Sequence, residues 1–295
     1  MPLPISGPLA ATVLLLAQSA VSTQADVDLQ SLMTTPVILA NGRRDVSQGT
    51  GFFFASTKAD GVTADTAFLV TNYHVVTGHG PQVQAPPAGD RIRFALHADI
   101  NDLERIRIVE LPLYDQHGLP VWVASETHPT ADVVLVPLPT EILKDIPPLW
   151  VFTEAHAKAD IRIRPTSGAT LLGYPYGFYD TKHSLPIWKT GHVASEPNVD
   201  FEGRPVFLVD VSAFPGMSGS PVLAVATGIY ESEDGVMKSG RVLKLLGIFS
   251  AMPVVHERKV DPTGAVVETP MDTSLQLGYV WKAALIADMA RSYRK

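Results

Sequence analysis

The segment best suited to chemistry is FPGMSGSPVL (214–223), which sets one serine among glycines. Ser218 stands between Gly216 and Gly219, just before an apolar run typical of a strand. A serine hydroxyl is a poor nucleophile until a base removes its proton, and the oxyanion formed on attack needs backbone N–H groups directed at one point. Glycines let the backbone turn sharply and approach a substrate, because they have no Cβ. The segment also fits an ordinary Gly/Ser turn, so a base must be found elsewhere.

A candidate base and a candidate carboxylate both lie at the ends of apolar runs. His74 in AFLVTNYHVVTG follows an apolar strand, and the two valines after it would bury one side of a short turn and fix the imidazole. Asp132 in HPTADVVLVPL begins a continuous apolar run, where a surface acid would gain little. Taken singly, His74 also fits a core histidine, and Asp132 also fits a turn residue before a strand.

The order of these residues along the chain separates alternative kinds of catalytic triad. The order here is His74, Asp132, Ser218, whereas subtilisin-type enzymes run Asp–His–Ser and α/β-hydrolases run Ser–Asp–His. GMSGS is also no nucleophile elbow of the G-x-S-x-G kind, because Ser220 stands where that motif has a glycine. A serine esterase on another fold is therefore disfavoured.

Three blocks of the sequence resemble those of the chymotrypsin-like (trypsin-fold) serine peptidases. TNYHVV is similar to the T-N-x-H-V-V block of the cysteine-free bacterial branch, which includes glutamyl endopeptidases and stress-related periplasmic proteases. ADVVLVPL is similar to its D-[IVL]-A-[VL]-L block, and GMSGSPV to its G-N-S-G-[GS]-P block. The resemblance extends over residues 49–291. It implies an all-β fold of two antiparallel six-stranded barrels packed together, with the active site in the cleft between them.

The resemblance also implies a role for each residue of the three blocks. Ser218 would attack the scissile carbonyl, His74 would take its proton, and Asp132 would hold the imidazole tautomer. The backbone N–H groups of Gly216 and Ser218 would form the oxyanion hole. Met217 precedes the serine, where zymogen-type animal enzymes have an aspartate. Activation through an ion pair with a new N-terminal ammonium is therefore not expected.

The specificity pocket departs from two well-defined types within the same family. Ser212 stands six residues before the nucleophile, where trypsin-type enzymes carry an aspartate for basic P1 side chains. Phe249 replaces the histidine with which glutamyl endopeptidases bind an acidic P1 side chain. We therefore expect a pocket for small or medium apolar P1 side chains. Its expected lining is Ser212, Ala213, Ile248, Phe249 and Ser250.

The elements around these residues read as many short strands. Between residues 51 and 138, apolar runs alternate with Gly, Pro, Asp and Asn, a pattern that suggests a β-barrel or sandwich. A connection over 145–160 separates them from a second strand set, which begins with IRIRP (161–165) and ends near residue 251. The tail changes period: Trp281, Leu285, Met289 and Tyr293 recur every four residues, which predicts a C-terminal amphipathic helix.

Composition excludes several classes of protein. The chain has 295 residues, 46% of them hydrophobic, so it can bury a sizeable core. Its net charge of −7 argues against nucleic acid or an anionic membrane as the main partner. With no cysteine it has neither disulfides nor a thiolate nucleophile. The remaining histidines show no metal-ligand spacing such as H-E-x-x-H, so we expect neither a metal nor a cofactor.

The N-terminal segment bears on where the protein works. Residues 9–20, LAATVLLLAQSA, have the length of a signal-peptide hydrophobic region, although no Lys or Arg precedes Arg43. We expect a signal peptide over 1–25 and a secreted or periplasmic protein. A short helix packed on the domain is the alternative, which would make the protein cytoplasmic. Residues 26–48 form an N-terminal extension in this interpretation, either a propeptide or part of the first barrel.

The sequence thus predicts a first barrel over 49–150 and a second over 151–295, the latter including the C-terminal helix. The predicted function is that of a monomeric serine endopeptidase, a hydrolase with polypeptide substrates. The alternative is a catalytically inactive binding module on the same fold, which would use the cleft or the loops for a partner protein.

Overall fold

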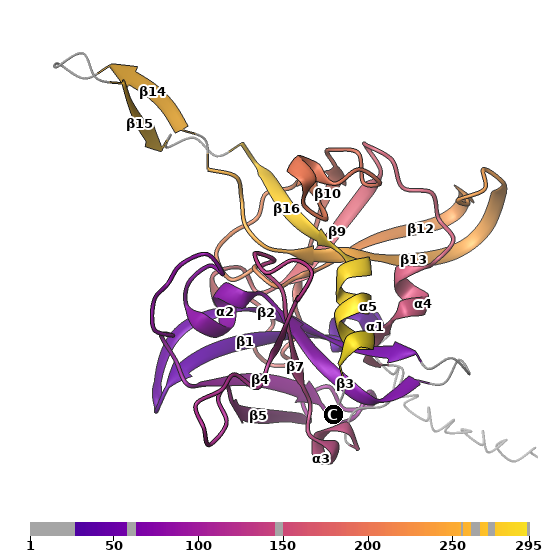
Figure 1. Cartoon of the computed structure of the whole chain (residues 1–295). Coiled ribbons are helices and arrows are strands. Elements are labelled where there is room, and N and C mark those ends of the chain that lie inside the picture. Colours follow the sequence, from indigo (N-terminus) through magenta and orange to yellow (C-terminus); the bar gives the residue numbers. More distant parts are fainter. Residues whose placement is uncertain are drawn as a thin grey trace, which may run out of the picture.

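A computed structural model describes residues 27–57, 63–144, 150–254, 256–260, 266–270 and 275–293. It has two β-sheet units and a C-terminal helix, as predicted (Figure 1). The expected signal peptide lies outside the described residues. No helix in the described part is long and apolar enough to cross a lipid bilayer.

The first unit is an eight-stranded sheet that curls until its two ends meet. The strand order is β5-β4-β1-β2-β3-β7-β6, and β8 adds to β2 in parallel. Beyond β5 and ahead of β6, Tyr114 bridges to Pro120, and the Val121 N–H donates to the Leu113 carbonyl at 3.0 Å. The strands are β1 (Thr34–Asn41), β2 (Arg44–Thr57), β3 (Thr63–Thr71), β4 (Arg91–His97), β5 (Ile106–Pro112), β6 (Val123–Ala124), β7 (Val134–Pro137) and β8 (Phe152–Thr153).

The second unit is a closed barrel with the strand order β10-β11-β16-β13-β12-β9. Between β13 and β16 the chain forms a separate hairpin, β14–β15, which extends away from the barrel in Figure 1. The strands are β9 (Gly168–Gly173), β10 (Ile187–Val193), β11 (Val206–Asp210), β12 (Pro221–Glu231), β13 (Met237–Phe249), β14 (His256–Val260), β15 (Val266–Pro270) and β16 (Leu277–Lys282).

Short helices connect the strands, and one longer helix ends the described chain. The helices are α1 (Leu29–Leu32), α2 (Tyr73–Thr77), α3 (Thr140–Leu143), α4 (Glu154–Ala157), the 3₁₀ turns η2 (Pro175–Gly177) and η3 (Phe201–Gly203), and α5 (Ala283–Ser292).

Three hydrophobic clusters explain why the two units form one body. Successive side chains of a strand point to opposite faces, so Phe53 enters the interior of the first sheet while Phe52 and Phe54 leave it. These two join a cluster shared with the second barrel, which includes Leu172 and Trp281. The third cluster fills the second barrel. Packing of the shared cluster therefore fixes the cleft in which residues of both units meet.

Helix α5 strengthens this junction. It buries Leu285, Ile286 and Met289 in the shared cluster, and it contacts β13 of the second barrel as well as β2 and β7 of the first sheet. The predicted amphipathic face is confirmed, but Trp281 belongs to β16, and the helix begins two residues later. Trp281 extends the apolar face because the strand runs directly into the helix.

Two segments bear on the expectations from the sequence. Residues 34–41, within the extension for which a propeptide and a part of the first barrel were both open, form β1 in the interior of the first sheet, paired with both β2 and β4. IRIRP (161–165), expected to begin the second strand set, is not a strand. It is joined to the end of β12 by one backbone hydrogen bond, from the Arg162 N–H to the Glu231 carbonyl at 2.9 Å. Its alternation arises because Ile161 and Ile163 face the protein while both arginines pair with Glu231.

Candidate active site

His74 is held by a single helical turn at the end of β3. Asn72 precedes α2, and its amide Nδ2 donates to the Asp132 carbonyl at 2.6 Å. Gly78 ends the turn in the left-handed region, at φ 84°, and its N–H donates to the His74 carbonyl at 2.8 Å. Val75 and Val76 are buried in the core of the first unit, as expected. Their burial anchors the helical turn and thereby fixes the direction of the His74 imidazole.

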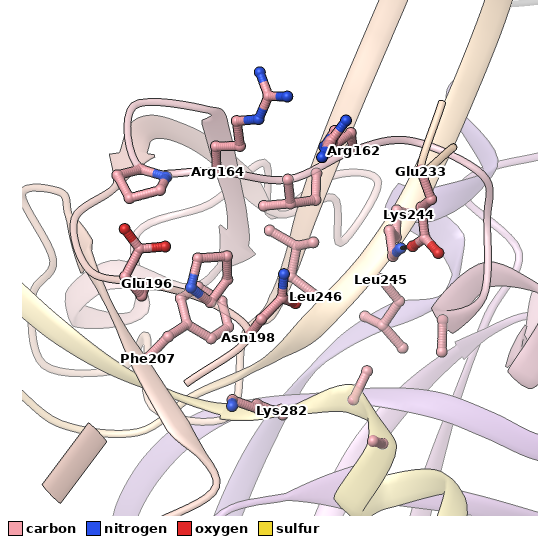
Figure 2. A pocket seen from close by; sticks show the side chains of 16 residues that line it. Arg162, Arg164, Glu196, Asn198, Phe207, Glu233, Lys244, Leu245, Leu246 and Lys282 are labelled. Atoms are coloured by element: carbon pink, nitrogen blue, oxygen red, sulfur yellow. Dashed lines mark hydrogen bonds and ion pairs between the residues drawn. The ribbon is translucent and has the colours of Figure 1, made fainter. Parts of the chain in front are cut away.

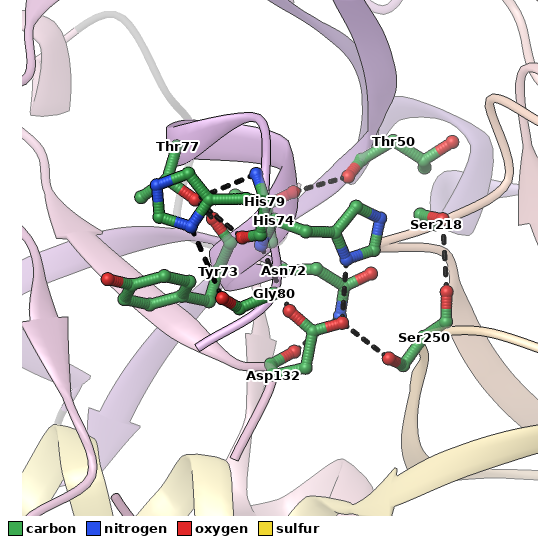
Figure 3. Close-up of polar contacts among 11 residues, drawn as sticks. Thr50, Asn72, Tyr73, His74, Thr77, His79, Gly80, Asp132, Ser218 and Ser250 are labelled. Carbon is green, nitrogen blue, oxygen red and sulfur yellow. Dashed lines mark hydrogen bonds and ion pairs between the residues drawn. The ribbon is translucent and has the colours of Figure 1, made fainter. Parts of the chain in front are cut away.

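Asp132 meets His74 with both carboxylate oxygens. Oδ1 accepts the backbone N–H of His74 at 3.0 Å, and Oδ2 accepts the Nδ1–H of the imidazole at 2.6 Å. The Ser250 hydroxyl also donates to Oδ2, at 2.5 Å (Figure 3). Burial on its own would raise the pKa of Asp132, but the bonds from His74 and Ser250 outweigh it and hold that pKa below its ordinary value. The carboxylate therefore stays ionised beside the imidazole.

Ser218 lies in the loop between β11 and β12, where the backbone carbonyls of residues 214–218 each accept a hydrogen bond. The Pro215 carbonyl accepts the Tyr176 N–H at 2.6 Å, and the Met217 carbonyl accepts the Ser220 N–H at 3.0 Å. All peptide bonds here are trans, so the N–H of each of these two peptide groups points opposite to its carbonyl. Those N–H groups belong to Gly216 and Ser218, and neither donates to another described residue. They are free to receive an anion.

The glycines flanking Ser218 are required by the conformation. Gly216 has φ 95° and Gly219 has φ 91°, both in the region that disfavours side chains. A Cβ on Gly216 would overlap the Tyr174 carbonyl, and one on Gly219 would overlap the Thr50 carbonyl. The sequence signal of Gly-x-Ser-Gly therefore reflects close packing of this loop against β2 and the end of β9.

The three predicted residues come together, but the hydroxyl of Ser218 is turned aside. In Figure 3 the imidazole of His74 lies between Asp132 and Ser218. The Ser218 hydroxyl donates to the Ser250 carbonyl at 3.0 Å, and in the described part of the chain it makes no bond to His74. Catalytic hydrogen bonds are often long or misaligned without substrate. A rotation about χ1 of Ser218 is the motion that redirects its oxygen.

The five residues expected to line the P1 pocket are placed differently from one another. Ser212 is exposed, and Ala213 is buried in the second barrel. Ile248 belongs to the shared cluster and Phe249 to the interior of the second barrel, so their side chains face away from solvent. The Ser250 side chain is directed to Asp132. A pocket here would use the backbone of 248–250, and its preference stays a prediction.

The sequence did not reveal two of the contacts that support this site. The Ser250 hydroxyl bonds to the carboxylate of Asp132, and the Thr50 side chain bonds to the loop that carries Ser218. The available signal was a polar residue in each of two otherwise apolar or glycine-rich runs, GTGFFF and GIFSA. Such residues are buried only with hydrogen-bond partners.

A cavity of about 630 Å³ lies elsewhere, on the second barrel (Figure 2). None of the three predicted residues lines it. Arg162 and Arg164 at its rim both pair with Glu231, Lys244 pairs with Glu233, and Lys282 pairs with Asp200. Because each Arg and Lys that lines it already has an acidic partner, the cavity offers no uncompensated positive charge to a ligand.

Two packed β units, the second of them a closed barrel, bring a histidine, an aspartate and a serine together at their junction, an arrangement typical of the chymotrypsin-like fold. Residues 49–229 match the family model of the trypsin-like peptidase domain. This match covers more than half of the sequence, and the chain belongs to the trypsin-like peptidase family.

Solved structures of proteases align with this chain at low sequence identity. A serine endoprotease from Yersinia pestis is 14% identical with a TM-score of 0.47, and the alignment covers 89% of this chain and 64% of that one. A thermostable serine protease from an extremophilic microorganism is 12% identical with a TM-score of 0.46, covering 90% and 98%. The chain thus spans less than two thirds of the Yersinia chain. A comparison with curated proteins gives no match.

Proposed function

We propose that the protein is a serine endopeptidase that hydrolyses peptide bonds through His74, Asp132 and Ser218. The observation that carries the proposal is the double contact between Asp132 and His74, through the backbone N–H and through Nδ1 at 2.6 Å. It leaves Nε2 of the imidazole as the basic atom, because Nδ1 holds its proton toward the carboxylate. Membership of the trypsin-like peptidase family supplies the reaction class.

In the proposed reaction, Ser218 Oγ attacks the carbonyl carbon of the scissile peptide while His74 Nε2 takes the hydroxyl proton. The tetrahedral intermediate collapses as the C–N bond breaks, and the leaving amine receives that proton from His74. Water then repeats the sequence on the acyl ester, which releases the carboxylic acid and restores Ser218. Asp132 stabilises the imidazolium in both halves and stays ionised throughout.

The developing oxyanion would be bound by the N–H groups of Gly216 and Ser218. Support comes from their lack of another acceptor among the described residues and from the two carbonyls that are tied back on the opposite side. Removing one such donor typically costs about 10²–10³-fold in kcat. Because these donors are backbone groups, their directions depend on the conformation of the loop.

The proposal includes a preference for small or medium apolar P1 side chains. It rests on Ser212, which is neutral and exposed, and on a pocket wall formed by the uncharged backbone of 248–250. Cleavage of a peptide library, read by mass spectrometry, tests it. Strong selection for Lys, Arg or Glu at P1 would refute this preference without touching the assignment of the reaction.

One observation favours the inactive binding module as a second candidate. The Ser218 hydroxyl bonds to the Ser250 carbonyl instead of the imidazole, and a protein that no longer needs a nucleophile could keep that arrangement. Such a module would bind peptides without turnover. It would also fail to react with a fluorophosphonate, which bonds covalently to activated serines.

The deciding experiment compares hydrolysis by wild type, Ser218→Ala and His74→Ala on the same peptide library. We expect turnover by wild type and a loss of about 10⁴-fold or more in each variant, with thermal unfolding unchanged within a few degrees. Absence of turnover in folded wild-type protein would favour the binding module. Equal turnover in the variants would mean that other residues do the chemistry.

We further propose that the protein is exported and works as a monomer. The support is the apolar segment over 9–20 in the sequence. N-terminal sequencing of protein recovered from fractionated native cells tests export, with a start near residue 26 expected. Light scattering at micromolar concentration tests the monomer.

A further inference from the structure

Thr50 is a fully buried polar residue of β2 that faces the loop carrying Ser218. It has no exposed surface, and it makes hydrogen bonds with its N–H, its carbonyl and its hydroxyl. Its backbone N–H donates to the Ser218 carbonyl at 2.7 Å, and its Oγ1 donates to the Gly216 carbonyl, also at 2.7 Å. One residue of the first sheet therefore holds two carbonyls of a loop that belongs to the second barrel.

The direction of the hydroxyl bond is fixed by a third partner. The Tyr174 N–H donates to Thr50 Oγ1 at 3.2 Å, so the hydroxyl oxygen accepts one hydrogen bond while its O–H donates to the Gly216 carbonyl. Such a chain, from an N–H through a hydroxyl to a carbonyl, is strengthened by mutual polarisation. In a buried site, each member left without its partner is costly.

The Gly216 carbonyl belongs to the peptide group between the two proposed oxyanion donors. Its other end is also held, because the Met217 N–H donates to the Phe214 carbonyl at 3.0 Å. A peptide group is planar, so these two bonds set its orientation. The Gly216 N–H on one side and the Ser218 N–H on the other then take their directions from it.

We propose that Thr50 is a positioning residue. Its hydroxyl holds the Gly216 carbonyl across the junction of the two units and thereby orients the N–H groups of the oxyanion hole. The inference rests on the proposed endopeptidase function. Thr50 touches no substrate and takes no part in proton transfer. It acts through the loop, and a glycine at position 216 is free to turn if this bond is lost.

The test is the isosteric variant Thr50→Val, which removes the hydroxyl and keeps the shape of the side chain. A displacement of about 1 Å can cost about 10²-fold in rate, so we expect kcat to fall by about 10–100-fold with KM changed by less than about twofold. A peptidyl boronic acid forms a tetrahedral adduct with a catalytic serine and imitates the oxyanion. Its inhibition constant should rise by about the same factor as kcat falls.

Two further variants separate positioning from general stability. Thr50→Ser keeps the hydroxyl and should restore kcat to within about threefold of wild type. Thr71→Val is the matched control: Thr71 is equally buried, and its hydroxyl donates to the Thr50 carbonyl at 2.7 Å. It should lower the unfolding temperature as Thr50→Val does while leaving kcat and boronate inhibition within about threefold.

The outcomes are distinct. If Thr50→Val matches wild type in kcat and boronate inhibition, or if Thr71→Val loses as much as Thr50→Val, the inference is wrong and the proposed function stands. If wild-type protein shows no turnover, both fall together. Should Thr50→Val fail to fold, Thr50→Ala removes the same hydroxyl with less bulk and carries the same comparison.

Discussion

Replacing Asp132 by asparagine exchanges one carboxylate oxygen for an NH₂ group and tests how the imidazole is held. The carboxylate accepts three hydrogen bonds, two at Oδ2 from His74 and Ser250 and one at Oδ1 from the His74 N–H. An amide has one oxygen and one NH₂ group, and the NH₂ group cannot accept. Whichever way the amide is turned, at least one donor of His74 then faces another donor.

The loss of kcat in Asp132→Asn depends on which of its two orientations the new amide adopts. With the amide oxygen toward the backbone N–H, the NH₂ group donates to Nδ1, so the imidazole must carry its proton on Nε2. That tautomer cannot take the Ser218 proton, a change worth about 10⁴-fold in kcat in related chemistry, or about 5.4 kcal/mol of transition-state stabilisation. With the opposite orientation, the N–H of His74 loses its acceptor and the ring is free to shift.

The assay is hydrolysis of one good peptide substrate by wild type and Asp132→Asn, with Asp200→Asn as control. Asp200 is half exposed and pairs with Lys282 far from the cleft, so its change should alter kcat/KM by less than about twofold. Both variants should remain folded by circular dichroism. An Asp132→Asn protein within about tenfold of wild type would refute the role assigned to the carboxylate.

Three further expectations follow from single contacts. Ser250→Ala removes a donor to Asp132 Oδ2 and should lower kcat by about tenfold with little change in KM, measured on the same substrate. Gly219→Ala puts a Cβ against the Thr50 carbonyl at φ 91° and should cost at least about 4 kcal/mol in urea unfolding; a loss below about 1 kcal/mol would contradict the packing. Burial lowers the pKa of His97, so its contribution to stability is complete above its ordinary value of 6.5 and is lost as the pH falls below it. His97→Gln, whose amide can still reach the His183 carbonyl, should therefore lose less unfolding free energy than wild type between about pH 7.5 and about pH 5.

The candidate site residues could be selected from the sequence because each combines a reactive side chain with a distinctive local pattern. A serine between glycines, a histidine after an apolar strand and an aspartate before another occupy the local conformations expected for them. In each case the local pattern and the tertiary packing agree. The apolar stripe of α5 was readable for the same reason, since a period of four marks one buried helix face.

The elements that were missed depend on partners far along the chain. Thr34–Asn41 contains an apolar run, PVILA, but only its pairing with β2 and β4 reveals it as the centre of a sheet. Trp281 was assigned to the C-terminal helix because it fits the helical period, whereas pairing with β11 and β13 places it in the strand over 277–282. IRIRP alternates like a strand, but it belongs to no strand. Its two arginines form ion pairs with Glu231 instead.

The roles of Thr50 and Ser250 could not be read from local sequence for a related reason. Thr50 bonds to Gly216, 166 residues away, and Ser250 bonds to Asp132, 118 residues away. The local sequence around Thr50 or Ser250 does not indicate which distant group either residue bonds to. Their polar side chains in buried runs indicate only that some partner exists.

The most direct test of the account is covalent labelling of the folded wild-type protein with an alkyl fluorophosphonate, followed by peptide mapping. A single adduct on Ser218, absent in Ser218→Ala and formed at least about 10³-fold more slowly in His74→Ala, is the predicted result. A folded protein that takes up no label, or that carries it on Ser220 instead, would contradict the assignment of nucleophile and base.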